Sequence, residues 1–188
     1  MIMKLSVYVS LLVFLSIIAC KVVKEEDNNN AAALNDYKLE SGDISPWTKT
    51  AEKDFSGVDQ LANDAFNGRA YSYEDNWGLD ITGAFLQSFS GTDNREISVY
   101  CIEFSNTTQA QTAFAEEKTE MVNNGNTAYD INGFDNTTAS LLKTGGDYNC
   151  LGVFDRFYVI MFMYGFQEVT DARSTAYSFL ALYEKRSR

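Results

Sequence analysis

Three carboxylates in the middle of the chain, Glu74, Asp75 and Asp80, lie close together in the sequence beside Trp77. Glycosidases use two carboxylates as general acid and base, and an aromatic ring can serve as a platform for the sugar. The spacing therefore allows a carboxylate-dependent hydrolase, with Glu103 as a further candidate. The alternative is that these side chains are solvated loop charges, because Asp and Glu are mostly exposed in proteins.

Aromatic side chains are concentrated in the same part of the chain. Ligand sites are mostly apolar pockets with a few polar groups, so this cluster is a candidate ligand groove. Its members are Tyr71, Tyr73, Trp77, Phe85 and Phe89. The alternative is that the rings form the core of the domain, because aromatic residues dominate protein interiors.

Residues 130–136, Asp-Ile-Asn-Gly-Phe-Asp-Asn, place several oxygen ligands around a glycine. Calcium loops share this pattern, but they end in a bidentate glutamate that is missing here. We therefore predict a polar turn rather than a metal site. Gly145 and Gly146 likewise lack the lysine and hydroxyl residue that follow the glycines of a phosphate-binding loop.

The chain contains no histidine. This absence excludes Ser-His and Cys-His catalytic pairs, histidine-based zinc sites and the usual switch near neutral pH, and we expect no metal and no cofactor. The formal net charge is −11, with 26 acidic against 15 basic residues. Binding of nucleic acid depends on basic side chains that neutralise phosphates, so nucleic acid is not an expected partner.

The N-terminal segment has a separate pattern. Residues 1–4 include one lysine, residues 5–18 are mostly apolar, and Ala19 directly precedes Cys20. This segment resembles the lipobox signal of bacterial lipoprotein precursors. The resemblance implies that residues 1–19 are a signal peptide, that the chain is cut before Cys20, and that the cysteine sulfur is diacylated.

Two other interpretations of this segment are an ordinary secretory signal and a membrane-spanning helix. The former needs no cysteine directly after Ala19, and the latter needs roughly 20 apolar residues, more than this run supplies before Lys21. We expect the lipid anchor, which is firm when two or three acyl chains insert. The expected location is the bacterial cell envelope, at the outer membrane, with membrane contact through the lipid.

Behind Cys20 the sequence is polar and of low complexity. Residues 20–53 are expected to be a flexible tether, because they have too little apolar surface to order themselves, and residues 54–188 are expected to be one globular domain. The acidic stretch that begins at Lys24 resembles the surface-export signals of lipoproteins in the Bacteroidetes group. A solubilising stalk is the alternative.

Lipidation of Cys20 leaves two cysteines, Cys101 and Cys150, in apolar, strand-like stretches. An exported chain reaches a compartment that permits disulfides, and a bridge across about 50 residues would add roughly 4 kcal/mol of stability. The alternative is two separate buried thiols that behave as small apolar groups. The sequence leaves both open, because it does not give the distance between the two Cα atoms.

The folded region alternates helical and strand-like patterns. Helices are predicted over residues 56–68 and 106–124 and from residue 170, and strands over residues 69–73, 84–90, 96–104, 139–143, 149–154 and 157–166. The last two strands form a hairpin, and the second should be central because it is apolar throughout.

The expected fold is α+β, an antiparallel β-sheet packed with two to three helices. This order of elements resembles the PsbP-like fold and small lipoprotein domains of unassigned function. The resemblance implies a sandwich of sheet and helices. The resemblance does not identify any functional residue.

Two functions fit these observations. The first is a non-catalytic, lipid-anchored envelope module that binds a partner protein, a glycan or a small ligand. The second is a carboxylate-dependent hydrolase of envelope or extracellular polysaccharide. The hydrolase requires a cleft that holds two of the carboxylates at roughly 5 to 10 Å, whereas the binding module requires only a pocket or a contact surface.

Overall fold

The computed structural model describes residues 33–64 and 69–188. Within them the chain forms a seven-stranded sheet in the order β1-β2-β3-β7-β6-β5-β4, and every pairing is antiparallel. The strands are β1 (Thr48–Phe55), β2 (Ile81–Ser90), β3 (Glu96–Phe104), β4 (Thr127–Tyr129), β5 (Ala139–Thr144), β6 (Asp147–Phe154) and β7 (Phe157–Tyr164).

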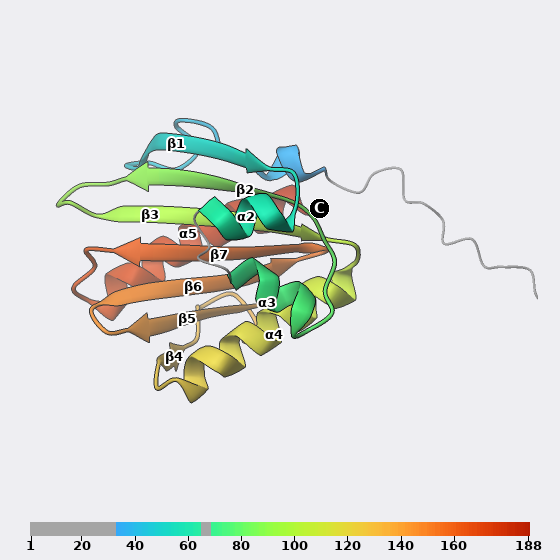
Figure 1. The fold of residues 1–188 in the computed structure, drawn as a ribbon. Helices are drawn as coiled ribbons and strands as arrows, with labels where there is room; N and C mark the ends of the chain where they lie inside the picture. The colour runs from blue at the N-terminus through green and yellow to red at the C-terminus, as the bar shows by residue number, and fades with distance from the viewer. Residues whose placement is uncertain (1–32, 65–68) are drawn as a thin grey trace, which may run out of the picture. The chain divides into compact units, whose positions relative to one another are not determined.

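The helices cover both faces of this sheet (Figure 1). They are η1 (Leu34–Tyr37), α2 (Val58–Asp64), α3 (Arg69–Asp75), α4 (Thr107–Asn123) and α5 (Val169–Arg186). Helices α2, α3 and α4 lie on one face and α5 lies on the other. The predicted α+β class is therefore confirmed.

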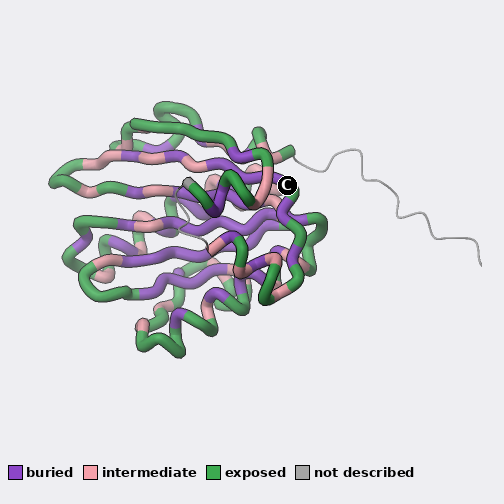
Figure 2. Tube along the Cα trace, viewed as in Figure 1, coloured by how far each residue is buried: buried purple, intermediate pink, exposed green. Residues whose placement is uncertain are grey.

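Strand β7 is the fourth of the seven strands, as its apolar sequence predicts. It follows β6 through a two-residue turn at Asp155 and Arg156, and Asp155 adopts a positive φ of 52°. A turn with positive φ matches the twist of the flanking strands. Figure 2 shows that burial is concentrated along these central strands.

Side chains alternate along the strands and divide the interior into two cores. In β3, Ile97, Val99 and Cys101 point to one core, while Ile102 and Phe104 point to the other. The α5 core includes Phe85, Phe89, Ile97, Val99, Cys101, Cys150, Met161, Phe179, Leu180 and Tyr183. The α4 core includes Leu61, Tyr73, Tyr100, Ile102, Phe104, Phe114, Met121, Tyr158 and Ile160.

The two long helices follow their apolar spacing. Helix α4 begins after Asn106, whose side chain accepts a hydrogen bond from the Gln109 backbone N–H at 3.0 Å, and this cap satisfies one of the free N–H groups of the first turn. Helix α5 packs close to β6 at Gly152, where a Cβ atom would lie 2.6 Å from Leu180 Cδ2. A larger residue at this position would require the Leu180 side chain to move.

The predicted strand at residues 69–73 is wrong, because this segment forms helix α3. Its tyrosines favour a strand by propensity. Within it, however, Ala70 and Tyr73 are the buried residues, and their spacing of three places both on one side of a helix. Packing of this side against the α4 core outweighs the local preference. The other strands named above are confirmed, as are the helices, while residues 65–68 of the first lie outside the described residues.

The assignment of residues 20–53 to a tether is corrected at its C-terminal part. Tyr37 and Leu39 are fully buried, and β1 begins at Thr48. The Gln87 side chain accepts a hydrogen bond from the Leu39 N–H at 3.0 Å and donates one to the Leu39 carbonyl at 3.1 Å. A few apolar residues with distant partners therefore order a segment that is locally polar. Residues 1–32, with Cys20, lie outside the described residues.

Candidate functional site

The four candidate carboxylates of a hydrolase come from three parts of the fold: helix α3, the segment that follows it, and strand β3. Glu74 and Asp75 lie on α3, and Asp75 is exposed. Asp80 accepts a hydrogen bond from the Ser105 hydroxyl, and Glu103 forms an ion pair with Arg156, with 2.8 Å between Oε1 and Nε. Asp80 and Glu103 therefore already have partners within the fold.

The structure does not bring the five aromatic residues of the predicted groove together. Tyr73 lies in the α4 core, whereas Phe85 and Phe89 lie in the α5 core on the opposite face of the sheet. Trp77 packs against Tyr73 with 5.1 Å between ring centroids, and Tyr71 is exposed. The groove prediction is therefore corrected: the rings of Tyr73, Phe85 and Phe89 are core, as the alternative interpretation held.

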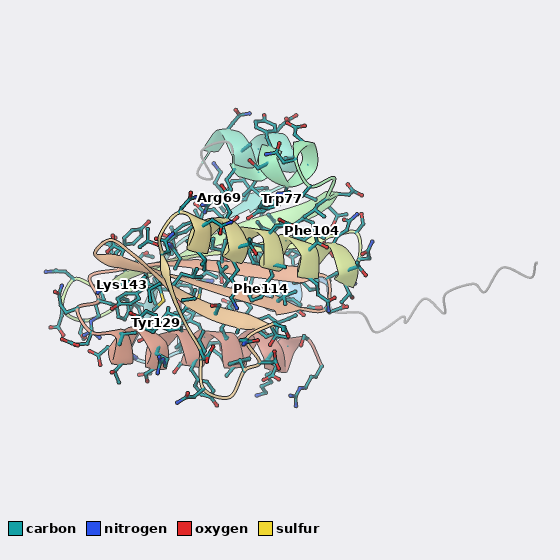
Figure 3. All side chains as sticks on the ribbon, turned by 90° about the horizontal axis from the view of Figure 1, so that it is seen from below. Arg69, Trp77, Phe104, Phe114, Tyr129 and Lys143 are labelled. Carbon is teal, nitrogen blue, oxygen red and sulfur yellow. The ribbon has the colours of Figure 1, made fainter. Side chains whose placement is uncertain are left out.

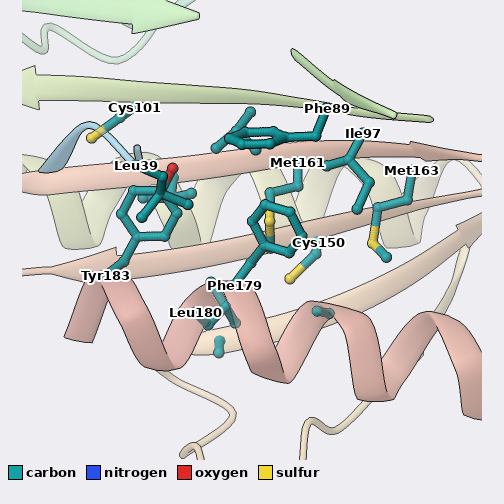
Figure 4. Close-up of a cluster of buried hydrophobic side chains, with 14 of the residues drawn as sticks. Leu39, Phe89, Ile97, Cys101, Cys150, Met161, Met163, Phe179, Leu180 and Tyr183 are labelled. Atoms are coloured by element: carbon teal, nitrogen blue, oxygen red, sulfur yellow. The ribbon is translucent and has the colours of Figure 1, made fainter. Parts of the chain in front are cut away.

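Cys101 and Cys150 are free thiols, and both are fully buried in the α5 core (Figure 4). Strand β7 separates them, because Cys101 pairs with Val159 and Cys150 pairs with Met161. Two strand spacings amount to about 9.5 Å, while a disulfide needs Cα atoms within about 7 Å. Of the two possibilities that the sequence left open, the structure therefore has the two separate buried thiols. Burial raises the pKa of both thiols, which lowers their reactivity.

A hollow lies between α5 and the β4–β5 loop (residues 130–138), within the described part of the chain. It has a volume of about 520 Å³, within the usual range for ligand sites. We call it the α5 groove, and its lining residues are Asn132, Gly133, Thr170, Arg173, Ser174 and Tyr177. None of them is acidic.

Helix α5 supplies one wall of the groove. Thr170, Arg173, Ser174 and Tyr177 recur at spacings of three and four residues, so they form one stripe along the helix. This polar and aromatic stripe accompanies the apolar stripe that contacts the sheet. The spacing of these residues is visible in the sequence, but they are not among the site residues predicted above. The loop that faces them is more than thirty residues away along the chain, so the sequence does not show that the two segments meet.

The β4–β5 loop supplies the other wall and is a polar turn, as predicted. Asp135 accepts hydrogen bonds from the Thr137 N–H and hydroxyl at 2.8 and 2.7 Å, which lower the pKa of its carboxyl. Within the described part of the chain, no cluster of three or more His, Cys, Asp or Glu residues is arranged to hold a metal ion. The loop contributes Asn132 and Gly133 to the lining of the groove.

The loop holds the Tyr177 ring in a defined position. Phe134 contacts this ring edge-on at 5.9 Å between centroids, and a Cβ atom at Gly133 would lie 3.0 Å from Tyr177 Cε2. Gly133 also has a φ of +91°, which only glycine adopts readily. The ring remains 47 % exposed, so its free face is available to a ligand.

Arg173 carries the charge of the α5 groove. Its guanidinium lies 5.8 Å from the Tyr129 ring centroid, and its Nε is buried without a hydrogen-bond partner among the described residues. All six arginines of the chain are described, and the other five pair with a carboxylate. These pairs are Arg69–Glu117, Arg95–Asp171, Arg156–Glu103, Arg186–Asp43 and Arg188–Glu184. In a chain of net charge −11, Arg173 is thus a positive charge without a counter-ion in the described structure.

A second polar cluster lies in the α4 core. The Glu117 side chain is 2 % exposed and is 3.1 Å from Arg69 Nη1, and the Tyr73 hydroxyl donates to its carboxylate at 3.1 Å. Burial raises the pKa of Glu117, while Arg69 and Tyr73 act against this rise. Figure 3 places Arg69 and Trp77 on the α4 side of the sheet and Tyr129 on the α5 side. The charges of this cluster compensate each other, so it is a structural ion pair.

The sequence already showed Glu117 as a charged residue within the apolar stripe of α4.

Comparison with known proteins gave no match: no family model, no curated protein and no solved structure matches the chain. Over residues 33–64 and 69–188, none of the helices combines the length and the apolar character needed to cross a membrane.

Proposed function

We propose that the protein is a non-catalytic binding module of the bacterial cell envelope, held at the outer membrane by a lipid on Cys20. The lipobox pattern of residues 1–20 supports the anchor. The acidic composition supports contact with the membrane through the lipid alone, because anionic headgroups repel an acidic surface. The module itself is proposed to be a PsbP-like sandwich, in keeping with an antiparallel sheet that has helices on both faces.

The α5 groove is the proposed binding site, and the observation that carries this proposal is the uncompensated charge of Arg173 beside an exposed tyrosine. A guanidinium without an internal partner favours the binding of a ligand that accepts its hydrogen bonds. Such charge-assisted hydrogen bonds are about twice as strong as neutral ones. The groove has no acidic side chain among its lining residues. Acid–base hydrolysis therefore has no catalytic pair there, and binding is the function that these residues support.

Labelling with palmitate tests the anchor. Cells that express the full chain should incorporate labelled palmitate into the wild type and not into Cys20→Ser. Cys150→Ala, which removes a buried thiol and keeps Cys20, should be labelled like the wild type. Equal labelling of wild type and Cys20→Ser would contradict the proposed location.

Mapping by NMR tests the binding site. The full-length protein, labelled with ¹⁵N, is titrated with a panel of neutral sugars, acidic sugars and short peptides. At least one member should shift the amide signals of residues 130–134 and 170–177 together, because both segments line the α5 groove. A panel that leaves these signals unchanged, or that shifts only signals elsewhere, would overturn the proposed site.

A further inference from the structure

We propose that the α5 groove recognises a carboxylate-bearing saccharide, that is, a uronic acid unit of an acidic polysaccharide. This inference rests on the proposed binding function of the groove and names the class of ligand. Three features of the groove lead to it: one unpaired guanidinium, one exposed ring on a rigid support, and a set of neutral hydrogen-bonding groups.

The guanidinium of Arg173 selects for a carboxylate. Arginine presents parallel N–H groups that match the two oxygens of a carboxylate, and Arg173 has no such partner among the described residues, whereas every other arginine does. A cation–π contact with the Tyr129 ring, 5.8 Å from Cζ to the ring centroid, helps to position the guanidinium. One guanidinium suits one carboxylate per sugar unit, while a phosphate-rich polymer needs several cations.

The exposed face of Tyr177 suits a saccharide ring. A sugar presents an apolar C–H face that packs on an aromatic side chain, and contact with Phe134 and Gly133 keeps Tyr177 in place before the ligand arrives. A binding group held in its bound conformation avoids part of the entropy cost of association. This ring explains why the ligand is a sugar acid rather than a simple carboxylate ion.

The remaining lining residues supply partners for hydroxyl groups. Asn132 offers an amide, and Thr170 and Ser174 offer hydroxyls, all of which both donate and accept hydrogen bonds. Arg173 and Tyr177 are four residues apart on α5, so their Cβ atoms lie roughly 5 to 6 Å apart. A single sugar unit can therefore place its carboxylate at Arg173 and its ring against Tyr177.

Calorimetric titration of the full-length protein tests this inference. The probes are trigalacturonic acid, the matched neutral galactose trisaccharide, and acetate. We expect trigalacturonic acid to bind at least tenfold more tightly than either of the others, and Arg173→Ala to remove this difference. Arg173→Lys should retain only part of it, because lysine cannot form the bidentate contact.

Matched variants separate the charge from the ring. Arg188→Ala removes an arginine that follows the end of α5 and is paired with Glu184 of that helix, and it should leave the affinity unchanged. Tyr177→Ala should weaken the binding of both trisaccharides. The thermal unfolding of each variant is measured alongside, so that a loss of affinity is assigned only to folded protein.

Four outcomes would overturn the inference: equal affinity for acidic and neutral trisaccharides, unchanged affinity in Arg173→Ala, acetate binding as tightly as the trisaccharide, or no binding of any probe. The proposed function is judged separately by NMR. A neutral sugar or a peptide that shifts the groove signals would preserve the binding function and exclude this ligand class.

Discussion

Arg69 and Arg173 lie on opposite sides of the same sheet, and each is close to tyrosine side chains. Arg69 faces the buried Glu117 carboxylate at 3.1 Å. Arg173 faces the α5 groove and has no carboxylate partner in the described structure. The difference teaches that residue types alone do not distinguish a structural ion pair from a site proposed to bind a ligand. The two arginines differ in whether the described part of the fold supplies a counter-ion.

The two arginines also differ in what their surroundings require. Removal of a carboxylate from water costs several kcal/mol, so Glu117 needs Arg69 and the Tyr73 hydroxyl in the folded state. Arg173 is half-buried beside a hollow and keeps access to water. Its charge can remain without a carboxylate partner because water solvates it.

The largest expected effect is the loss of Arg69. Arg69→Ala leaves Glu117 buried without its counter-ion, and removal of one partner of a buried pair is strongly destabilising. We expect the free energy of unfolding to fall by about 3 kcal/mol at pH 7, and by less at pH 4.5, where protonation removes the unpaired charge. Urea unfolding at the two pH values measures both quantities.

Arg173→Ala is the matched control for this comparison. It removes the same side chain from a site without a carboxylate, so stability should fall only by the contact with the Tyr129 ring, about 0.5 to 1 kcal/mol. A loss as large as that of Arg69→Ala would show that Arg173 has a structural partner, and the contrast between the two sites would fail.

A smaller effect is expected in the pH dependence of stability. Because burial raises the pKa of Glu117, the group contributes stability that is fully present below its ordinary value of 4.5 and is lost as the pH rises through the raised value. The stability of the wild type relative to Glu117→Gln should therefore decrease as the pH is raised from 4.5. Urea midpoints across this range provide the measurement.

The control for the titration is Glu116→Gln, which removes an exposed carboxylate from the same helix. Its stability relative to the wild type should change less with pH than that of Glu117→Gln. Parallel profiles for the two variants would show that burial does not set the protonation of Glu117.

Elements with long, regular patterns were predictable from the sequence. Helices α4 and α5, strand β3 and the β6–β7 hairpin lie where the apolar spacing predicts them, because each presents a continuous apolar face that only one period satisfies. Helix α3 was not predictable, since its seven residues carry too short a pattern to outweigh the strand preference of its tyrosines. The ordered residues 34–53 were missed for a related reason: their anchors, such as Gln87, are distant along the chain.

The candidate site was predictable only in part. The Thr170-to-Tyr177 stripe and the polar turn at residues 130–136 are both visible in the sequence. That they face each other depends on the position of β4 at the sheet edge and of α5 across it. The aromatic residues around Trp77 do not form the predicted groove. Although they are close in the sequence, they lie on opposite faces of the sheet.

Composition and local pattern by themselves determined the α+β class, the absence of histidine chemistry and the lipobox resemblance at Cys20. Tertiary structure decided which arginine is neutralised, which aromatic rings are buried, and that β7 separates Cys101 from Cys150. The physical reason is that charge compensation and burial depend on distances in space. For residues that are far apart along the chain, these distances are fixed only when the sheet and the helices pack together.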